Sequence, residues 1–107
     1  MPNLYDALPV GGAAEEFIEL LSCPGLKIER IVSGGQASPP GSWYDQPQAE
    51  WVVLLRGEAQ LAFEGESAPR RLRAGDYVDI PPHCRHRVES TSALALWLAV
   101  HYERRES

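Results

Sequence analysis

The sequence predicts a single all-β domain of the barrel or sandwich type, and three observations support this fold class. The chain has 107 residues, the usual size of one domain and too few for two separate cores. Turn-forming residues recur about every ten residues from residue 26 onward, a spacing typical of barrels and sandwiches. No helical pattern separates the expected strands, so the crossovers of a parallel sheet are missing. We expect an N-terminal arm and helix over 1–25, a barrel over 26–102 and a polar tail over 103–107.

Composition and charge limit the class of partner. Fifteen acidic and ten basic side chains give a formal net charge of −5, which disfavours nonspecific binding to nucleic acid or anionic membranes. The chain lacks a run of roughly 18 apolar residues that could span a membrane, and its first ten residues lack the features of a signal peptide. Cys23 and Cys84 are too few for a secreted disulfide scaffold. We therefore expect a cytoplasmic protein with free thiols.

The N-terminal part contains the one segment with helical periodicity. Within residues 13–22, three large apolar side chains fall at helical spacing, acidic residues occupy the first turn, and Pro24 with Gly25 ends the pattern. The sequence predicts a helix here. The next segment, residues 26–32, alternates and predicts a strand that two glycines close.

The remaining chain predicts one loop followed by closely spaced strands. Residues 38–48 contain three prolines and a glycine, which excludes a long regular element. A charged turn is expected over residues 65–71. The predicted strands cover residues 50–56, 58–64, 77–80, 85–89 and 94–102.

Two segments carry residues at motif spacing. Residues 50–57, EWVVLLRG, place Glu50 and Gly57 with six residues between them, and residues 75–86, GDYVDIPPHCRH, contain Gly75, Pro81 and His86. These segments resemble the two motifs of the cupin superfamily, and most of the chain is similar to short bacterial single-domain cupins of unassigned activity. The resemblance implies a double-stranded β-helix, or jelly-roll barrel, with a short N-terminal helix. It also implies that Glu50 and His86 point inward from neighbouring strands and face each other.

The first motif departs from the family pattern. Its two histidine places fall on Trp43 and Asp45, or on Tyr44 and Gln46 in the shorter spacing, and neither pair contains histidine. His83 stands where the second motif has a glycine. The family's usual site is three histidines and one glutamate around a divalent ion such as iron, manganese, nickel or zinc.

The resemblance therefore leaves two interpretations of the site. In the first, Glu50, His86 and Asp45 bind a divalent ion, and His83 or His101 approaches from elsewhere. In the second, Glu50 and His86 form a hydrogen-bonded polar pair in a barrel that binds no metal.

The loop before residue 50 supplies the other candidate residues. Trp43 and Gln46 are expected to line a pocket at the barrel mouth, although aromatic residues could equally plug the barrel end. Tyr44 or His83 is the candidate for moving a proton in catalysis. We consider a metal-dependent enzyme acting on a small hydroxy or keto acid, a metal-free binding or sensor module, and an oligomer-forming accessory protein.

The strand over residues 50–56 also predicts the assembly. If Glu50 points into the barrel, alternation directs every second side chain outward. The outward row is apolar and needs a cover, which the N-terminal helix or a second subunit could supply. Because a two-fold dimer is the commonest soluble assembly, we predict a homodimer. The inward residues are Val52 and Leu54, and the outward ones are Trp51, Val53 and Leu55.

Overall fold

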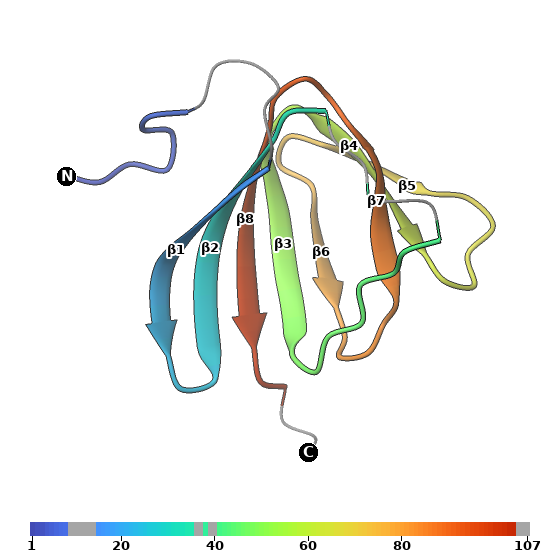
Figure 1. Cartoon of the computed structure of the whole chain (residues 1–107). Helices are drawn as coiled ribbons and strands as arrows, with labels where there is room; N and C mark the ends of the chain where they lie inside the picture. Colours follow the sequence, from blue (N-terminus) through green and yellow to red (C-terminus); the bar gives the residue numbers. More distant parts are fainter. Residues whose placement is uncertain (9–14, 36–37, 39–40, 105–107) are drawn as a thin grey trace.

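The computed structural model describes residues 1–8, 15–35, 38 and 41–104, which form two antiparallel sheets (Figure 1). The larger sheet has the order β1-β2-β8-β3-β6 and the smaller one β5-β4-β7. The described residues form no helix, so the all-β prediction is confirmed, and none of them could cross a membrane as a helix. The strands are β1 (Glu16–Cys23), β2 (Leu26–Ser33), β3 (Ala49–Arg56), β4 (Glu58–Phe63), β5 (Arg70–Arg73), β6 (Tyr77–Ile80), β7 (His86–Thr91) and β8 (Ala95–Tyr102).

The predicted N-terminal helix is wrong. The described part of that segment is the edge strand β1, which pairs antiparallel with β2, whereas residues 13 and 14 lie outside the described part of the chain. A bulge between Glu19 and Leu21 shifts the register and breaks the alternation, which is why the apolar residues imitate helical spacing. Pairing with β2 satisfies the backbone of the segment and overrides its helical pattern.

The charged segment after β4 contains a strand that the sequence did not predict. The expected turn ends earlier than predicted, and β5 begins at Arg70 and pairs with β4. Leu72 is the one buried residue of this strand, so a single inward side chain carries the apolar signal. The other predicted strands agree with the structure to within two residues.

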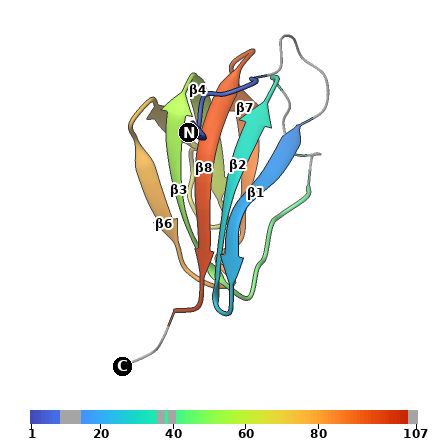
Figure 2. The same ribbon diagram turned by 90° about the vertical axis from the view of Figure 1, so that its left-hand side faces the viewer.

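The core lies between the two sheets, which form two layers in the side view (Figure 2). On β3 the alternation is as predicted: Val52 and Leu54 are buried in the core, whereas Trp51, Val53 and Leu55 are half-buried on the outer face. The smaller sheet contributes Leu61 and Phe63 of β4 and Leu72 of β5, and the larger sheet adds Ile80, Ala95, Trp97 and Ala99.

Candidate functional site

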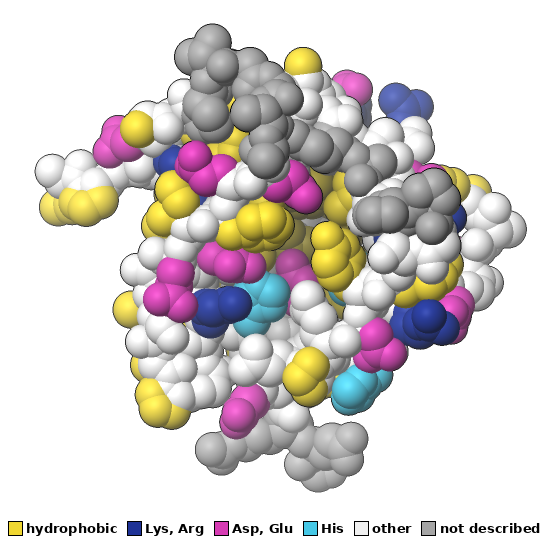
Figure 3. All heavy atoms as spheres, viewed as in Figure 1, with side chains coloured by type: hydrophobic (Ala, Val, Ile, Leu, Met, Phe, Trp, Pro, Cys, Tyr) yellow, Lys and Arg dark blue, Asp and Glu magenta, His cyan; other side chains and the backbone are white. Residues whose placement is uncertain are grey.

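A cavity of about 130 Å³ opens between the sheets, large enough for several waters and hence for a small ligand. The space-filling view shows a hollow in the centre of this face, with acidic, histidine and hydrophobic side chains around it (Figure 3). Strands of both sheets line the cavity, and so does the segment before β3. The apolar wall residues are Phe17, Ile31, Val52, Leu61, Ile80, Val88 and Trp97.

Glu50 enters the cavity from β3. Its Cα partners are His101 on β8 and Ile80 on β6, so it lies on an interior strand of the larger sheet and is 8% exposed. Burial raises the pKa of Glu50 above its ordinary value, and this effect exceeds the lowering by the neighbouring His101 and His86. A carboxyl group in this setting can hold a proton closer to neutral pH than an exposed one.

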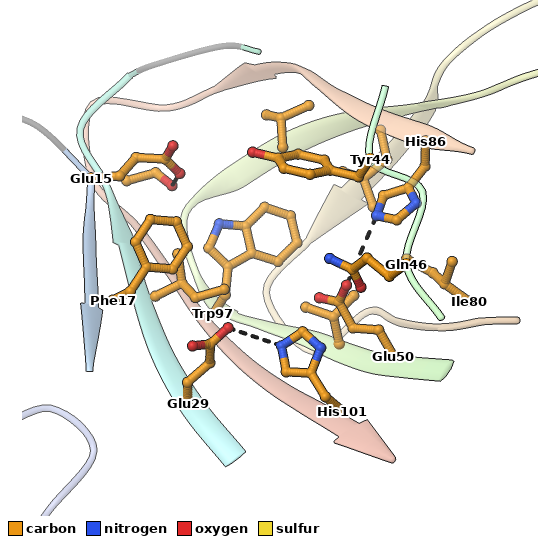
Figure 4. Close-up of a pocket in the computed structure, with 15 residues that line it drawn as sticks. Glu15, Phe17, Glu29, Tyr44, Gln46, Glu50, Ile80, His86, Trp97 and His101 are labelled. Carbon is orange, nitrogen blue, oxygen red and sulfur yellow. Dashed lines mark hydrogen bonds and ion pairs between the residues drawn. The ribbon is translucent and has the colours of Figure 1, made fainter. Parts of the chain in front are cut away.

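His86 enters from the opposite sheet. Its Nδ1 lies 2.9 Å from the carbonyl oxygen of Cys84, and because a carbonyl can only accept, Nδ1 carries a proton. Nε2 is directed into the cavity, 3.9 Å from Glu50 Oε1 (Figure 4). The rings of Phe63 and Tyr44 flank the imidazole, with centroids at 6.0 and 5.6 Å. Glu50 and His86 therefore face each other as expected, but from β3 and β7 of different sheets and not from neighbouring strands.

A second carboxylate–imidazole pair lies beside the first. His101 Nε2 donates to Glu29 Oε1 at 2.9 Å, and both side chains are largely buried. Glu29 comes from β2, and the pair lies next to Glu50 in the close-up view (Figure 4). The sequence left the orientation of His101 open and did not identify Glu29. The signal was alternation along residues 26–33, which carries Glu29, Ile31 and Ser33 into the cavity.

Along the segment before β3, successive side chains alternate between the cavity and the outside of the barrel. Tyr44 and Gln46 line the cavity, and Tyr44 forms an isolated bridge with His86. The shorter spacing before Glu50 is therefore the one whose side chains reach the cavity. Among the residues expected in the site, the structure brings together Tyr44, Gln46, Glu50 and His86.

The alternate side chains of that segment lie outside the cavity, which corrects three expected placements. Trp43 does not line the pocket, and its ring lies 4.6 Å from the guanidinium of Arg87. Asp45 does not join the inward residues, because its Oδ1 pairs with His83 Nδ1 at 2.8 Å, where both side chains are exposed. His83 lies in the turn before β7 with φ +60, and its exposed side chain is not part of the cavity lining.

The inward donor set does not fit the family's divalent ion. Glu50 and His86 hold the ligand places, but a tyrosine and an amide occupy the two histidine places, and His101 is engaged with Glu29. Among the described residues, no three His, Cys, Asp or Glu side chains are grouped in a way that could hold an ion. The pocket therefore offers hydrogen bonding and proton exchange from its own side chains.

Comparisons with known proteins agree with this architecture. Residues 28–101 match the family model described as "Cupin domain". No curated protein matches the chain. A solved structure from Ralstonia eutropha JMP134, described as a "putative mannose-6-phosphate isomerase", is 52% identical, with a TM-score of 0.94 over 97% of this chain and 98% of that chain.

More distant solved structures share the fold. A cupin superfamily protein from Desulfitobacterium hafniense DCB-2 is 15% identical, with a TM-score of 0.77 over 91% of this chain and 84% of that one. An RmlC-like cupin with a double-stranded β-helix fold from Methanocaldococcus jannaschii is 17% identical, with a TM-score of 0.72 over 91% and 92% of the two chains. At this level of identity the likeness concerns the fold alone.

Proposed function

The chain belongs to the cupin family, and on that premise we propose that it binds a small organic ligand in its barrel without a resident metal ion. The observation that carries the proposal is the gap of 3.9 Å between Glu50 Oε1 and His86 Nε2. This distance is too long for a direct hydrogen bond, yet both groups are buried and directed into the cavity. Buried polar groups need partners, and a ligand hydroxyl between them would supply one. The proposal includes a cytoplasmic location, where Cys23 and Cys84 remain reduced.

The side chains around this gap support orientation of a polar ligand. In the tautomer whose Nδ1 proton is donated to Cys84, a neutral His86 accepts at Nε2. Glu50 accepts when ionised and donates when protonated. The amide of Gln46 adds a donor and an acceptor beside them, and the hydroxyl of Tyr44 adds another polar group. A few convergent polar groups in an apolar cavity are typical of small-molecule sites.

We expect purified, tag-free protein to contain no stoichiometric divalent ion and to bind small polar compounds that raise its melting temperature. Elemental analysis by mass spectrometry measures the first, and a thermal-shift screen of neutral, cationic and anionic metabolites measures the second. Glu50→Gln and His86→Gln should each abolish the shift, whereas Asp45→Asn, which alters a carboxylate outside the cavity, should retain it. A stoichiometric ion that is lost in both cavity variants would overturn the metal-free proposal.

A second candidate function is isomerase chemistry by proton transfer. The observation that favours it is the 52% identity to the protein described as a "putative mannose-6-phosphate isomerase". A buried carboxyl group with a raised pKa, opposite an imidazole, is a suitable acid–base pair for moving a proton on a small hydroxy or keto compound, and Tyr44 lies beside it. His83 does not line the pocket, because its side chain is 68% exposed and pairs with Asp45. Turnover of a bound compound that Glu50→Gln abolishes would favour this candidate over simple binding.

The outer face of the larger sheet supports a homodimer. Trp51, Val53 and Leu55 form a half-buried row on β3, and the ring of Trp51 lies 5.5 Å from that of Tyr77, which is 66% exposed. The N-terminal residues Leu4 and Asp6 reach this face through Arg30, but the segment expected to cover the row as a helix is the edge strand β1. A two-fold partner would bury the same row on both subunits. Further apolar residues on this face by register are Ile28, Leu98 and Val100.

We predict that Trp51→Asp converts a dimer into a monomer, because a charge at the centre of an apolar interface is left without a partner. Light scattering after size exclusion at micromolar concentration measures the mass. Arg71→Asp, on the smaller sheet, is the matched control and should remain dimeric. A monomeric wild type, or a Trp51→Asp variant with an unchanged dimer mass, would contradict the prediction.

A further inference from the structure

The cavity is lined by acidic side chains without lysine or arginine among the described residues. Among the described residues that line it, three are glutamates and none is lysine or arginine. Glu29 and Glu50 come from β2 and β3, the two strands that flank β8, and Glu15 lies directly before β1. Ser33 Oγ donates to Glu15 Oε2 at 3.1 Å, which holds that carboxylate against the cavity. The register also places Glu19 opposite Glu29, so a further acidic residue lies next to this site.

The basic groups nearest the cavity do not reverse this sign. Lys27 Nζ lies 3.9 Å from Glu29 Oε2, but the lysine side chain is 42% exposed and does not line the cavity. His101 forms its hydrogen bond with Glu29, and His86 Nδ1 is used by the backbone. Arg30 is directed to the outer face, where it binds the carbonyl oxygens of Leu4 and Asp6. A phosphate or carboxylate ligand would therefore meet carboxylates without a guanidinium or ammonium partner.

Aromatic rings surround the same part of the cavity. Phe17, Tyr44 and Trp97 all line it, and the close-up view shows Phe17 and Trp97 next to each other with Glu15 near them (Figure 4). Trp97 is 4% exposed and forms the floor, whereas Phe17 is 56% exposed and lies at the opening. The negative faces of aromatic rings attract cations, and sites for quaternary ammonium groups combine such rings with carboxylates.

From this arrangement we propose that the pocket selects a small organic ammonium compound and rejects phosphorylated ones. The ammonium group lies among Phe17, Trp97 and Tyr44 with Glu15 and Glu29 beside it, and the polar end of the ligand reaches Glu50 and His86. This inference rests on the proposed ligand-binding function of the same cavity and adds the charge class of the ligand. It also separates the chain from a phosphosugar substrate, because the cavity lining contains no cation for the phosphate.

Calorimetric titration with choline, with its neutral carbon isostere 3,3-dimethylbutan-1-ol, and with mannose and mannose 6-phosphate tests the inference. Choline should bind roughly tenfold more tightly than the isostere, because the two compounds differ in charge and hardly in shape. Mannose 6-phosphate should bind more weakly than mannose. Equal or weaker binding of choline than of the isostere, or preferred binding of the phosphorylated sugar, would overturn the charge assignment.

Carboxamide variants locate the selectivity. Glu15→Gln combined with Glu29→Gln should reduce choline affinity roughly tenfold and leave the affinity of the isostere unchanged. Glu64→Gln, in the turn after β4, is the control and should bind choline as the wild type does. The single variant Glu15→Gln alters an exposed residue, so it reports on the same carboxylate should the double variant fail to fold. An unchanged preference for choline in the folded variants would overturn the role of these carboxylates.

The same titrations distinguish the two levels of the proposal. If a neutral compound binds and Glu50→Gln abolishes its binding while choline does not bind, the ligand-binding function stands and the ammonium assignment fails. If none of the four compounds binds, both the ammonium assignment and the proposed recognition of small polar ligands are contradicted.

Discussion

Gly57→Ala is expected to lower the free energy of unfolding by about 2–4 kcal/mol, which combines backbone strain with overpacking. Gly57 joins β3 to β4 with φ +90, a conformation that costs little only for glycine. A Cβ atom at this position would lie 2.4 Å from the carbonyl oxygen of Leu94 and 2.5 Å from Ser92 Oγ. The first of these is a backbone atom directly before β8, so a side-chain rotation cannot relieve the clash.

Gly65→Ala is the matched control. Gly65 has φ +91, but no atom lies within 4 Å of the position its Cβ would occupy. Its alanine variant should lose about 1 kcal/mol, from the left-handed backbone alone. Thermal unfolding followed by circular dichroism should show a fall of roughly 10–20 °C for Gly57→Ala and a few degrees for Gly65→Ala. Equal losses in the two variants would mean that the segment around Leu94 moves aside.

The motif spacing identified Gly57 from the sequence because the constraint on this residue is local. A turn with positive φ and close approach of two chains requires the absence of a side chain, and sequence displays that requirement directly. The inward orientation of Glu50, Val52 and Leu54 was predictable for a similar reason, because strand alternation follows from one fixed position. These features depend on few residues and no distant partner.

The N-terminal strand was not predictable in the same way. The apolar residues of β1 form a helical pattern only because the bulge between Glu19 and Leu21 interrupts their alternation. What selects the strand is pairing with β2, the next strand along the chain, and periodicity within the segment does not report that pairing. Phe17, which the helical pattern placed on the apolar face of a helix, is therefore part of the pocket wall in the structure.

The inward face of β2 shows a related limit. The apolar residues Leu26 and Ile28 lie on one face of this strand, but the cavity lies on the face that carries Glu29 and Ile31. Polarity usually marks the solvent side of a strand, and a polar pocket inside a barrel reverses that rule. The Glu29–His101 pair consequently became visible only when β2 and β8 were placed side by side. Residues that act through a partner remote in sequence lack a local signal.

Glu50→Gln is expected to stabilise the fold at pH 8 and to lose this advantage as the pH falls. Burial raises the pKa of Glu50 in the folded state above its ordinary value of 4.5. The folded protein therefore holds this proton more tightly than the unfolded chain does. Wild-type stability from this group is complete below the ordinary glutamate pKa and is lost as the pH rises through the folded-state pKa. Glutamine does not titrate and avoids that loss.

Several charged groups around Glu50 determine the size of the effect. His101 on β8 and His86 on β7 lower the pKa, Glu29 on β2 raises it and Lys27 on the same strand lowers it, but burial is the largest cause. Chemical unfolding of both proteins from pH 4 to pH 8 measures the difference in unfolding free energy. The gain for Glu50→Gln should increase steadily with pH across this range.

Glu66→Gln supplies a control of opposite sign. The hydrogen bond from Arg70 lowers the pKa of Glu66, so this carboxylate stabilises the fold above its ordinary pKa and loses that contribution as the pH falls. Its variant should be slightly destabilised at pH 8, and only slightly because the pair is exposed.

If Glu50→Gln followed the Glu66→Gln profile, Glu50 would be stabilised as an anion by an imidazolium, and its carboxylate would be an internal counter-ion. An opposite profile means that the fold retains a carboxyl group at a cost to its own stability. That cost is expected of a group kept for binding, because a ligand can supply a partner that the side chains of the pocket do not.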